Sequence, residues 1–310
     1  LLSKLTSLRK SSKLINSSCE ITSVSLRHPG GASGYKFQTN EGHFCYFLDH
    51  EYDDESSNDL FEAAKGLNAK ALITGHYIIS QGFGHNRQLH RAKDSEKDQS
   101  YFLFKTTRDQ LEFLRFPLGD FKKSEIRSFA NEIGLTVSDK PDSQDICFVP
   151  DGKYADILKK IDPNNLKPGH LKSVDGNILG QHKGIVNFTI GQRKGLGVAT
   201  GVPLYVIDIN PDNHDVILGS KDDLRTRDIY VRDVNWIGDD DISQIEDKKI
   251  KIKAKIRSTQ EPKLANLFLS NQQLCINFYE DVEGVSPGQA CVFYDANNSS
   301  RVLGGGWITQ

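Results

Sequence analysis

The spacing of apolar residues in the first half of the chain predicts a mixture of strands and helices. Residues 21–26 alternate apolar and polar side chains, as a half-buried strand does, and residues 43–48 and 69–74 are two further β-prone runs. Residues 59–68 place apolar side chains on one helical face directly before the third run. This alternation predicts an α/β layer fold, in which ligands bind beyond the carboxyl ends of the strands.

Two more helices are expected before residue 150. Thr107 and Gln110 have the spacing of a capping box that opens a helix reaching Leu114. A second helix is followed by Gly134, the residue type that commonly ends a helix. Its apolar face consists of Ile126, Phe129, Ala130 and Ile133. The glycine-rich residues 27–34 lack the Lys-Ser/Thr ending of a phosphate-binding loop, so a turn is expected there.

The pattern changes after residue 150. Residues 154–161 predict a short helix, and turn-rich sequence then leads to residues 189–198, where three glycines surround Arg193 and Lys194. Such a loop can contact a phosphate backbone, or it can be an ordinary hairpin with solvated bases, and both interpretations remain open. From residue 221 on, short strands and turns predict a small β-barrel.

One strand of that barrel has an unusual pattern. Between residues 249 and 257, aliphatic side chains alternate with cationic ones, so one face should enter the core while the other carries positive charge. The cationic positions are Lys249, Lys251, Lys253, Lys255 and Arg257. Such a row suits a polyanion, although a solvated strand face has the same pattern.

Composition narrows the class of protein. With 310 residues the chain is long enough for two or three domains, and its formal net charge of −2 means that nucleic-acid binding would depend on local basic patches. The five cysteines are scattered without a Cys-x-x-Cys pair. This argues against a disulfide framework and a cysteine-pair zinc site, and it favours a reducing compartment. No apolar run approaches the ~18 residues of a membrane span.

The start of the chain has a composition of its own. The first 18 residues are basic, rich in serine and free of acidic residues, as organellar transit peptides are. A surface helix or a frayed end is the interpretation that we favour. The chain contains no methionine, which is compatible with a fragment of a longer protein.

Two stretches combine residues that can carry chemistry. Residues 140–148 place Cys147 behind a polar run. If positive surroundings lower the pKa of its thiol, Cys147 can act as a sulfur nucleophile or carrier. The alternative is a buried structural cysteine. Gly75 and His76 follow the predicted strand at residues 69–74, where glycine lets a nucleotide approach the backbone and the imidazole projects into the same crevice. A hydrogen-bonded structural histidine is the alternative.

Long motifs in a fixed order give the chain a specific resemblance. Together they resemble the tRNA-specific 2-thiouridylases, bacterial and organellar enzymes that thiolate the wobble uridine. The resemblance covers residues 59–310. The matching segments are residues 74–77, 97–103, 142–148, 182–184, 189–198, 287–289 and 303–306.

The resemblance implies a three-part protein. An N-terminal α/β domain of the ATP-pyrophosphatase class (adenine nucleotide α-hydrolase-like) is followed by a small central domain and a C-terminal β-barrel. We place these at residues 1–150, 151–220 and 221–310, with the first domain incomplete and the second binding tRNA. The implied cofactor is ATP with Mg²⁺, and the implied partners are tRNA and a sulfur-donor protein of a cysteine desulfurase relay. We expect a monomer without membrane contact in the cytoplasm, or alternatively in a mitochondrial or other organellar matrix.

The resemblance also implies roles for individual residues. In the family, ATP adenylates the C2 oxygen of uridine so that AMP can leave, and a cysteine persulfide delivers sulfur to C2. Cys147 matches the persulfide-bearing cysteine, Gly75 matches a nucleotide-contacting position, and Leu26 falls near the strand end that contacts adenine. No protein-held metal is expected. The positions that match tRNA contacts are His76, Lys97, Asp98, Gln99, Arg257, Ser258 and Gln289, where Ser258 replaces the tyrosine of the family.

Two family motifs are missing from this sequence. These are the Ser-Gly-Gly-x-Asp-Ser pyrophosphate loop and the Asn-Pro-Cys segment with the other catalytic cysteine, expected between residues 52 and 59. Cys19 and Cys45 do not stand in matching contexts. The leading hypothesis is a tRNA-uridine 2-sulfurtransferase, and the alternative is a catalytically inactive tRNA-binding remnant. A third hypothesis, an adenylating enzyme for a small molecule, leaves the basic strand and the loop at residues 189–198 unexplained.

Overall fold

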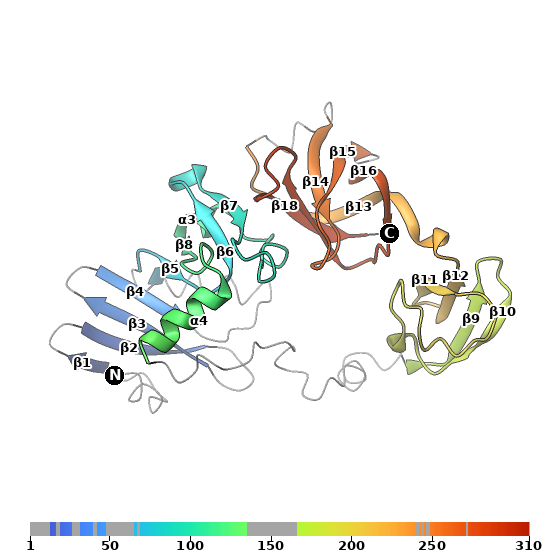
Figure 1. Cartoon of the computed structure of the whole chain (residues 1–310), viewed down its shortest axis with the longest axis horizontal. Coiled ribbons are helices and arrows are strands. Elements are labelled where there is room, and N and C mark those ends of the chain that lie inside the picture. Colours follow the sequence, from blue (N-terminus) through green and yellow to red (C-terminus); the bar gives the residue numbers. More distant parts are fainter. Residues whose placement is uncertain are drawn as a thin grey trace. The chain divides into compact units, whose positions relative to one another are not determined.

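The computed structural model divides into two compact units, whose elements are labelled in Figure 1. The first unit consists of Leu1–Asp139, Asn235–Asp239 and Ser300–Gly304, and the second of Lys140–Val234, Asp240–Ser299 and Gly305–Gln310. The structure describes strands at residues 13–16, 19–26, 32–39 and 42–47, and then residues 65–66, 69–134, 166–239, 242, 245, 249–270 and 272–309.

A six-stranded sheet dominates the first unit. In spatial order its strands are β1 (Lys13–Asn16), β2 (Cys19–Leu26), β3 (Ala32–Thr39), β4 (Gly42–Phe47), β5 (Leu72–Ile73) and β8 (Leu114–Arg115). β1 to β4 form an antiparallel meander, seen side by side in Figure 1, whereas β5 is parallel to β4 and to β8. The strands predicted at residues 21–26 and 43–48 are present, and the one predicted at residues 69–74 is shorter than expected.

The helices α3 (Arg108–Phe113) and α4 (Lys123–Glu132) confirm two of the predicted helices. The capping box of α3 is complete, because Thr107 Oγ1 accepts from Gln110 N–H at 3.3 Å and Gln110 Oε1 accepts from Thr107 N–H at 3.0 Å. Gly134 follows α4 in the left-handed region, with a φ of 73°. The apolar face of that helix is not buried as expected, since Phe129 is 48% and Ile133 71% exposed.

A hairpin of β6 (Ile78–Gln81) and β7 (Gln88–Arg91) completes the first unit. β7 pairs with Arg301 and Val302 at the start of β18 (Arg301–Ile308). The Asn235 amide donates to Phe104 O at 2.7 Å and to Thr106 O at 2.9 Å. Two short segments from the last third of the chain, Asn235–Asp239 and Ser300–Gly304, are thus integral to this unit.

A four-stranded sheet forms the central part of the second unit. Its strands are β9 (Gly169–Ser173), β10 (Ile178–His182), β11 (Tyr205–Asn210) and β12 (Asp215–Gly219), in the order β10-β9-β12-β11. β9 and β12 are parallel, and both outer pairs are antiparallel. The sheet has a small core of its own, formed by Leu171, Ile185, Leu196, Val206, Val216 and Leu218.

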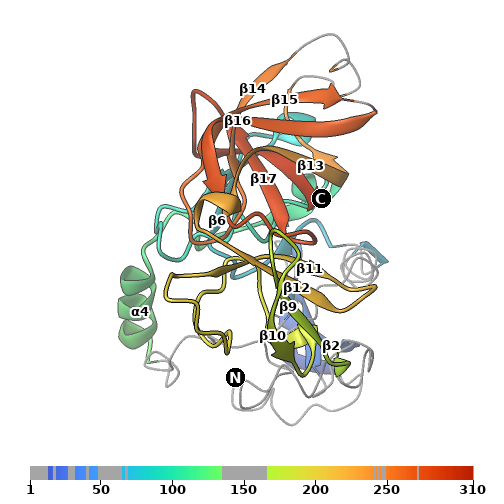
Figure 2. The same ribbon diagram turned by 90° about the vertical axis from the view of Figure 1, so that its right-hand side faces the viewer.

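Six strands then form the predicted β-barrel. They are β13 (Arg225–Trp236), β14 (Ile250–Lys255), β15 (Lys263–Ser270), β16 (Gln273–Glu283), β17 (Ala290–Asp295) and β18. Their order is β13-β16-β15-β14-β17-β18, and a further pairing of β13 with β18 closes the ring. Figure 2 shows β14, β15 and β16 side by side in this barrel.

The strand with alternating cations is β14 with its flanking residues, and its cations do not form the expected exposed row. Lys255 is only 4% exposed, and Lys253 Nζ donates to Ser299 Oγ at 2.5 Å. Lys249 and Lys251 remain exposed, with Lys249 over the Phe268 ring of β15 and Lys251 over the Tyr279 ring of β16. The prediction of an aligned row is wrong for Lys255, because alternation fixes the face of a side chain but not what covers that face.

Several predicted features lie outside the described residues. Cys147 and the helix predicted at residues 154–161 are among them, as are residues 27–31 of the expected glycine-rich turn. Of the helix predicted at residues 59–68, only residues 65–66 are described, and both are helical.

Candidate functional site

The carboxyl end of β5 carries the first candidate residues. β5 lies between two parallel neighbours, so Gly75 and His76 follow a strand at the position where α/β folds bind ligands. Gly75 is exposed, and a Cβ there would meet only Leu118 Cδ1 at 3.7 Å, an ordinary contact. Within the described part of the chain nothing requires glycine at this position, and its backbone is open to a ligand.

Gln99 is fixed against this loop at two points. Its backbone N–H donates to Tyr77 O at 3.0 Å, and its side-chain Oε1 accepts from Tyr77 N–H at 2.8 Å. Because a backbone N–H can only donate, the second bond identifies the side-chain oxygen and directs the amide Nε2 away from Tyr77. The amide N–H donors of Gln99 are therefore not used by Tyr77.

His76 lies beside Gln99, with 3.3 Å between its Nδ1 and Gln99 Oε1. Because this oxygen can only accept, Nδ1 carries the proton. Burial lowers the pKa of His76 below its usual 6.5, and the contact with Gln99 opposes this shift to a smaller extent. At neutral pH, His76 is a neutral imidazole protonated at Nδ1.

The buried carboxylate of Asp98 accepts hydrogen bonds that stabilise the same turn. Its side chain is 2% exposed. Oδ2 accepts from Arg91 Nε at 3.0 Å and from Ser100 Oγ at 2.8 Å, and Oδ1 accepts from the N–H groups of Ala92 at 3.1 Å and Ser100 at 3.2 Å. Both oxygens are occupied. The geometry favours a supporting role for Asp98 over the direct tRNA contact that the resemblance implies.

The same stretch also exposes an aromatic ring, whereas Lys97 near its start is half-buried. Phe102 is 66% exposed, whereas Tyr101 and Phe104 on either side of it are buried. Its N–H donates to Gln99 O at 3.1 Å, and the Tyr101 ring packs edge-on against it with 5.5 Å between centroids. A fixed, exposed ring is a surface on which a base can stack. The sequence does not reveal Phe102, because spacing alone cannot tell which residue of an aromatic run stays outside.

Leu26 ends β2 at the same edge of the sheet as Gly75. β2, β4 and β5 run in the same direction, since β3 is antiparallel to both β2 and β4. Two strands, β3 and β4, stand between β2 and β5. At about 4.8 Å per strand, the two strand ends are roughly 14 Å apart, so Leu26 and Gly75 share an edge without being adjacent.

The remaining candidate residues lie in the second unit. Ser258 is exposed in the turn after β14. The guanidinium of Arg257 donates to the backbone carbonyls of Gly284 and Ile190. Gln289 Oε1 is buried, with no hydrogen-bond partner among the described residues. Buried acceptors without a partner are uncommon in native proteins, so a donor from a ligand or from water would complete this one.

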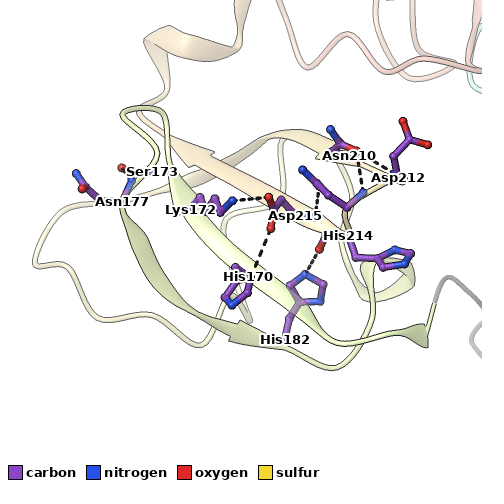
Figure 3. Close-up of polar contacts among 10 residues, drawn as sticks. His170, Lys172, Ser173, Asn177, His182, Asn210, Asp212, His214 and Asp215 are labelled. Carbon is purple, nitrogen blue, oxygen red and sulfur yellow. Dashed lines mark hydrogen bonds and ion pairs between the residues drawn. The ribbon is translucent and has the colours of Figure 1, made fainter.

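Figure 3 shows what the motif at residues 182–184 does. His182 Nδ1 accepts from Gly184 N–H at 3.1 Å, so its proton is on Nε2, which donates to His214 O at 2.9 Å. A Cβ at Gly169 would lie 1.9 Å from His214 O, so this contact depends on glycine. His182 therefore joins β10 to the turn between β11 and β12 and acts as a structural residue.

A charged pair in the same close-up links β9 to β12. Lys172 Nζ donates to Asp215 Oδ2 at 2.6 Å, and His170 Nδ1 lies 3.7 Å from Asp215 Oδ1. Asp215 is 5% exposed. The hydrogen bond and charge of Lys172 hold the pKa of the Asp215 carboxyl below its usual 3.8. The pair stabilises the parallel strands and provides the buried Asp215 carboxylate with a partner.

Cys275 and Cys291 are the cysteines with described side chains, and both are buried. Burial raises the pKa of both thiols, and the charge of Asp228 raises that of Cys275 further. Both stay protonated at neutral pH, whereas sulfur transfer needs a thiolate. No described cluster of three or more His, Cys, Asp or Glu residues could hold a metal ion. None of the described helices is long and apolar enough to span a bilayer.

Comparison with known domain families gives three consecutive matches. Residues 57–151 match the family described as "tRNA methyl transferase HUP domain", and residues 155–220 match "tRNA methyl transferase PRC-barrel domain". Residues 226–308 match "Aminomethyltransferase beta-barrel domain". The predicted fold class is confirmed: an N-terminal α/β domain of the HUP type precedes a small central domain and a C-terminal β-barrel.

Individual relatives resemble most of the chain. It is 50% identical over 256 residues to a tRNA-specific 2-thiouridylase MnmA of Parvibaculum lavamentivorans, an alignment that covers 81% of this chain and 64% of the relative. The enzyme of the same name from Bartonella bacilliformis is 50% identical over 253 residues, covering 81% and 65%. That of Brucella suis is 48% identical over 251 residues, covering 81% and 63%. The chain spans less than two thirds of the length of these relatives.

Proposed function

Because the chain belongs to the tRNA-specific 2-thiouridylase family, we propose that it is a tRNA-uridine 2-sulfurtransferase. The proposed reaction is the ATP-dependent 2-thiolation of the wobble uridine of tRNA through a cysteine persulfide. The resemblance seen in the motifs is confirmed at the level of the family. Substrate, ATP dependence and the persulfide step belong to the proposal.

The arrangement of Gly75, His76 and Gln99 carries this proposal. Gly75 leaves the backbone open at the carboxyl end of a strand with two parallel neighbours. Gln99 has its oxygen occupied by Tyr77 N–H and presents amide donors. The ring carbonyls of a uridine are acceptors, so they complement these donors. A neutral His76 next to them can share a hydrogen bond without placing a charge beside the base.

The roles proposed for individual residues combine the chemistry that the family implies with the contacts that the structure describes. Cys147 is the proposed persulfide carrier, since the buried thiols of Cys275 and Cys291 do not suit this role. ATP with Mg²⁺ supplies, when bound, the adenylation that converts the C2 oxygen into a leaving group. Gly75 and Leu26 are the proposed ATP-contacting positions, and Asp98 supports the turn. The proposed tRNA-binding positions are His76, Lys97, Gln99, Ser258 and Gln289, and Arg257 is proposed to act on tRNA through the loop that it holds.

The domain limits and partners are proposed in the same way. An ATP-binding domain at residues 1–150, a tRNA-binding central domain at 151–220 and a barrel at 221–310 agree with the order of the three domain matches. The partners are tRNA and a sulfur-donor protein, and the protein acts as a monomer. A cytoplasmic location is proposed, with an organellar matrix as the alternative.

Thiolation of unmodified tRNA is the direct test. The purified protein is incubated with ATP, Mg²⁺, tRNA, a thiol reductant and a cysteine desulfurase with cysteine as the persulfide donor, and 2-thiouridine is measured by mass spectrometry of the digested RNA. We expect a product that needs ATP and disappears in Cys147→Ser. The matched control Cys275→Ser should retain it, because a buried, protonated thiol takes no part in the transfer. Equal activity of Cys147→Ser and the wild type would refute the assigned role of Cys147.

A tRNA-binding remnant without catalysis is the second candidate. It would keep the basic loop at residues 189–198, whose Arg193 and Lys194 are exposed. The remnant should bind tRNA at low salt but show no saturable ATP binding by calorimetry, whereas the enzyme should bind both. ATP binding that weakens in Gly75→Val, while tRNA binding persists, would decide for the enzyme.

A further inference from the structure

The guanidinium of Arg257 makes hydrogen bonds within the second unit. Nε and Nη2 donate to Gly284 O at 3.2 and 2.7 Å, and Nη2 also donates to Ile190 O at 3.3 Å. Gly284 follows β16 of the barrel, whereas Ile190 belongs to the loop before β11 in the central sheet. One side chain therefore links the backbones of two parts that are far apart in sequence.

Two glycines make room for this guanidinium. A Cβ at Gly284 would lie 2.7 Å from Arg257 Nη2, and a Cβ at Gly191 would lie 3.6 Å from the same atom. Both glycines are in the left-handed region, with φ values of 69° and 86°. The site that holds the Arg257 guanidinium is shaped by the backbone, and its two acceptors are carbonyl groups rather than carboxylates. Neither carbonyl neutralises the positive charge of Arg257.

Further hydrogen bonds hold the loop that contains Ile190. Gln192 Oε1 accepts from Thr189 N–H at 2.9 Å, and Gln192 Nε2 donates to Lys194 O at 3.0 Å. Gly191 N–H donates to Val206 O at 2.8 Å, and Leu196 is buried in the central core. These contacts hold both sides of the loop and leave the side chains of Arg193 and Lys194 exposed.

We propose that Arg257 is a positioning residue, which fixes the basic loop at residues 189–197 on the barrel and acts on tRNA through Arg193 and Lys194. The inference rests on the proposed function for its ligand, a phosphate backbone. A loop that is already fixed loses little conformational freedom when it meets the RNA, so its two cations bind more tightly than on a loose loop. A direct Arg257–phosphate contact is the competing explanation.

Arg257→Lys is the informative substitution. A lysine keeps the charge but carries a single ammonium instead of a planar fork, so it cannot serve both carbonyls as the guanidinium does. Arg227→Lys is the matched control, because Arg227 is an exposed barrel arginine paired with Asp281 outside the loop. Hydrogen exchange without RNA should show residues 187–198 exchanging at least roughly 5-fold faster in Arg257→Lys and unchanged in Arg227→Lys. Unchanged exchange in Arg257→Lys overturns the proposal.

A double-mutant cycle then separates action through the loop from direct contact. In the wild-type background, we expect Arg257→Lys to weaken tRNA binding by roughly 5- to 10-fold. In a background of Arg193→Ala with Lys194→Ala, it should weaken binding by less than about 2-fold, because the groups that it positions are gone. Equal effects in both backgrounds would establish direct contact instead. Failure of the wild type to bind tRNA would count against the proposed function alone, since the exchange experiment contains no RNA.

Discussion

Replacing Gln99 by glutamate separates its structural contact from its proposed contact with RNA. The two side chains have the same shape. In the wild type, Tyr77 N–H donates to Gln99 Oε1 at 2.8 Å, and a carboxylate oxygen of glutamate can still accept this hydrogen bond. The amide N–H donors, however, are lost. The variant should therefore fold normally but bind tRNA poorly, with a negative charge where a uridine carbonyl is expected.

The size of the effect follows from the bonds involved. A hydrogen bond that specifies a base contributes about 1–3 kcal/mol, and loss of the amide donors should lower tRNA affinity and thiolation by roughly 5- to 150-fold. The stability of Gln99→Glu should stay within about 0.5 kcal/mol of the wild type at neutral pH. In Gln99→Ala, Tyr77 N–H loses its partner, which costs about 1–3 kcal/mol of unfolding free energy.

The histidine beside Gln99 gives a second readout. In the wild type, burial lowers the pKa of His76, so this group reduces stability as the pH falls below 6.5. A carboxylate facing Nδ1 in Gln99→Glu raises that pKa, and the loss of stability on acidification should become smaller or reverse.

Three measurements on the same proteins test this reasoning. They are urea unfolding, tRNA affinity by fluorescence anisotropy and a histidine titration by NMR. Wild-type tRNA affinity in Gln99→Glu would refute the donor role of the amide. Destabilisation as large as that of Gln99→Ala would refute the account of the contact with Tyr77.

Three further substitutions probe other parts of the structure. Gly169→Ala should lower the unfolding free energy by about 2–4 kcal/mol, measured by urea unfolding, because its Cβ would lie 1.9 Å from His214 O and must displace backbone. Asp215 has a lowered pKa, so its pair with Lys172 should stabilise the protein above pH 3.8 and be lost as the pH falls through the lower folded-state value; acid unfolding of Lys172→Met should lack this component. Phe102→Ala should leave the melting temperature nearly unchanged, because the ring is 66% exposed, but lower tRNA affinity by roughly 5-fold or more through lost stacking; unchanged affinity would remove Phe102 from the proposed interface.

Local sequence signals predicted local structure well. The capping box at Thr107 and Gln110 and the glycine after α4 involve residues three or four positions apart, and both are present. Burial was harder to predict. The face of α4 that contains Phe129 and Ile133 is more exposed than its periodicity suggested, and Lys255 is buried. In both cases exposure depends on distant segments, and periodicity within one element carries no information about them.

In the candidate site too, individual residues were easier to predict than their arrangement in space. Gly75, His76 and Gln99 could each be identified from motifs, but their mutual arrangement depends on hydrogen bonds across 22 and 23 residues. The direction of the Gln99 amide is set by Tyr77 N–H, a backbone group that no side-chain pattern reveals. Asp98 lies within the same motif and turns inward, because four donors converge on its carboxylate.

Hydrogen bonds to backbone groups orient the two most informative residues. Gln99 is held by both backbone atoms of Tyr77, and Arg257 by the carbonyls of Gly284 and Ile190. Because these hydrogen bonds are formed within the protein itself, both orientations exist before a ligand binds, and little entropy is lost in fixing them. It also follows that no second-site side-chain change can easily restore either contact. The conservative exchanges Gln99→Glu and Arg257→Lys should therefore impair RNA binding even though they preserve size or charge.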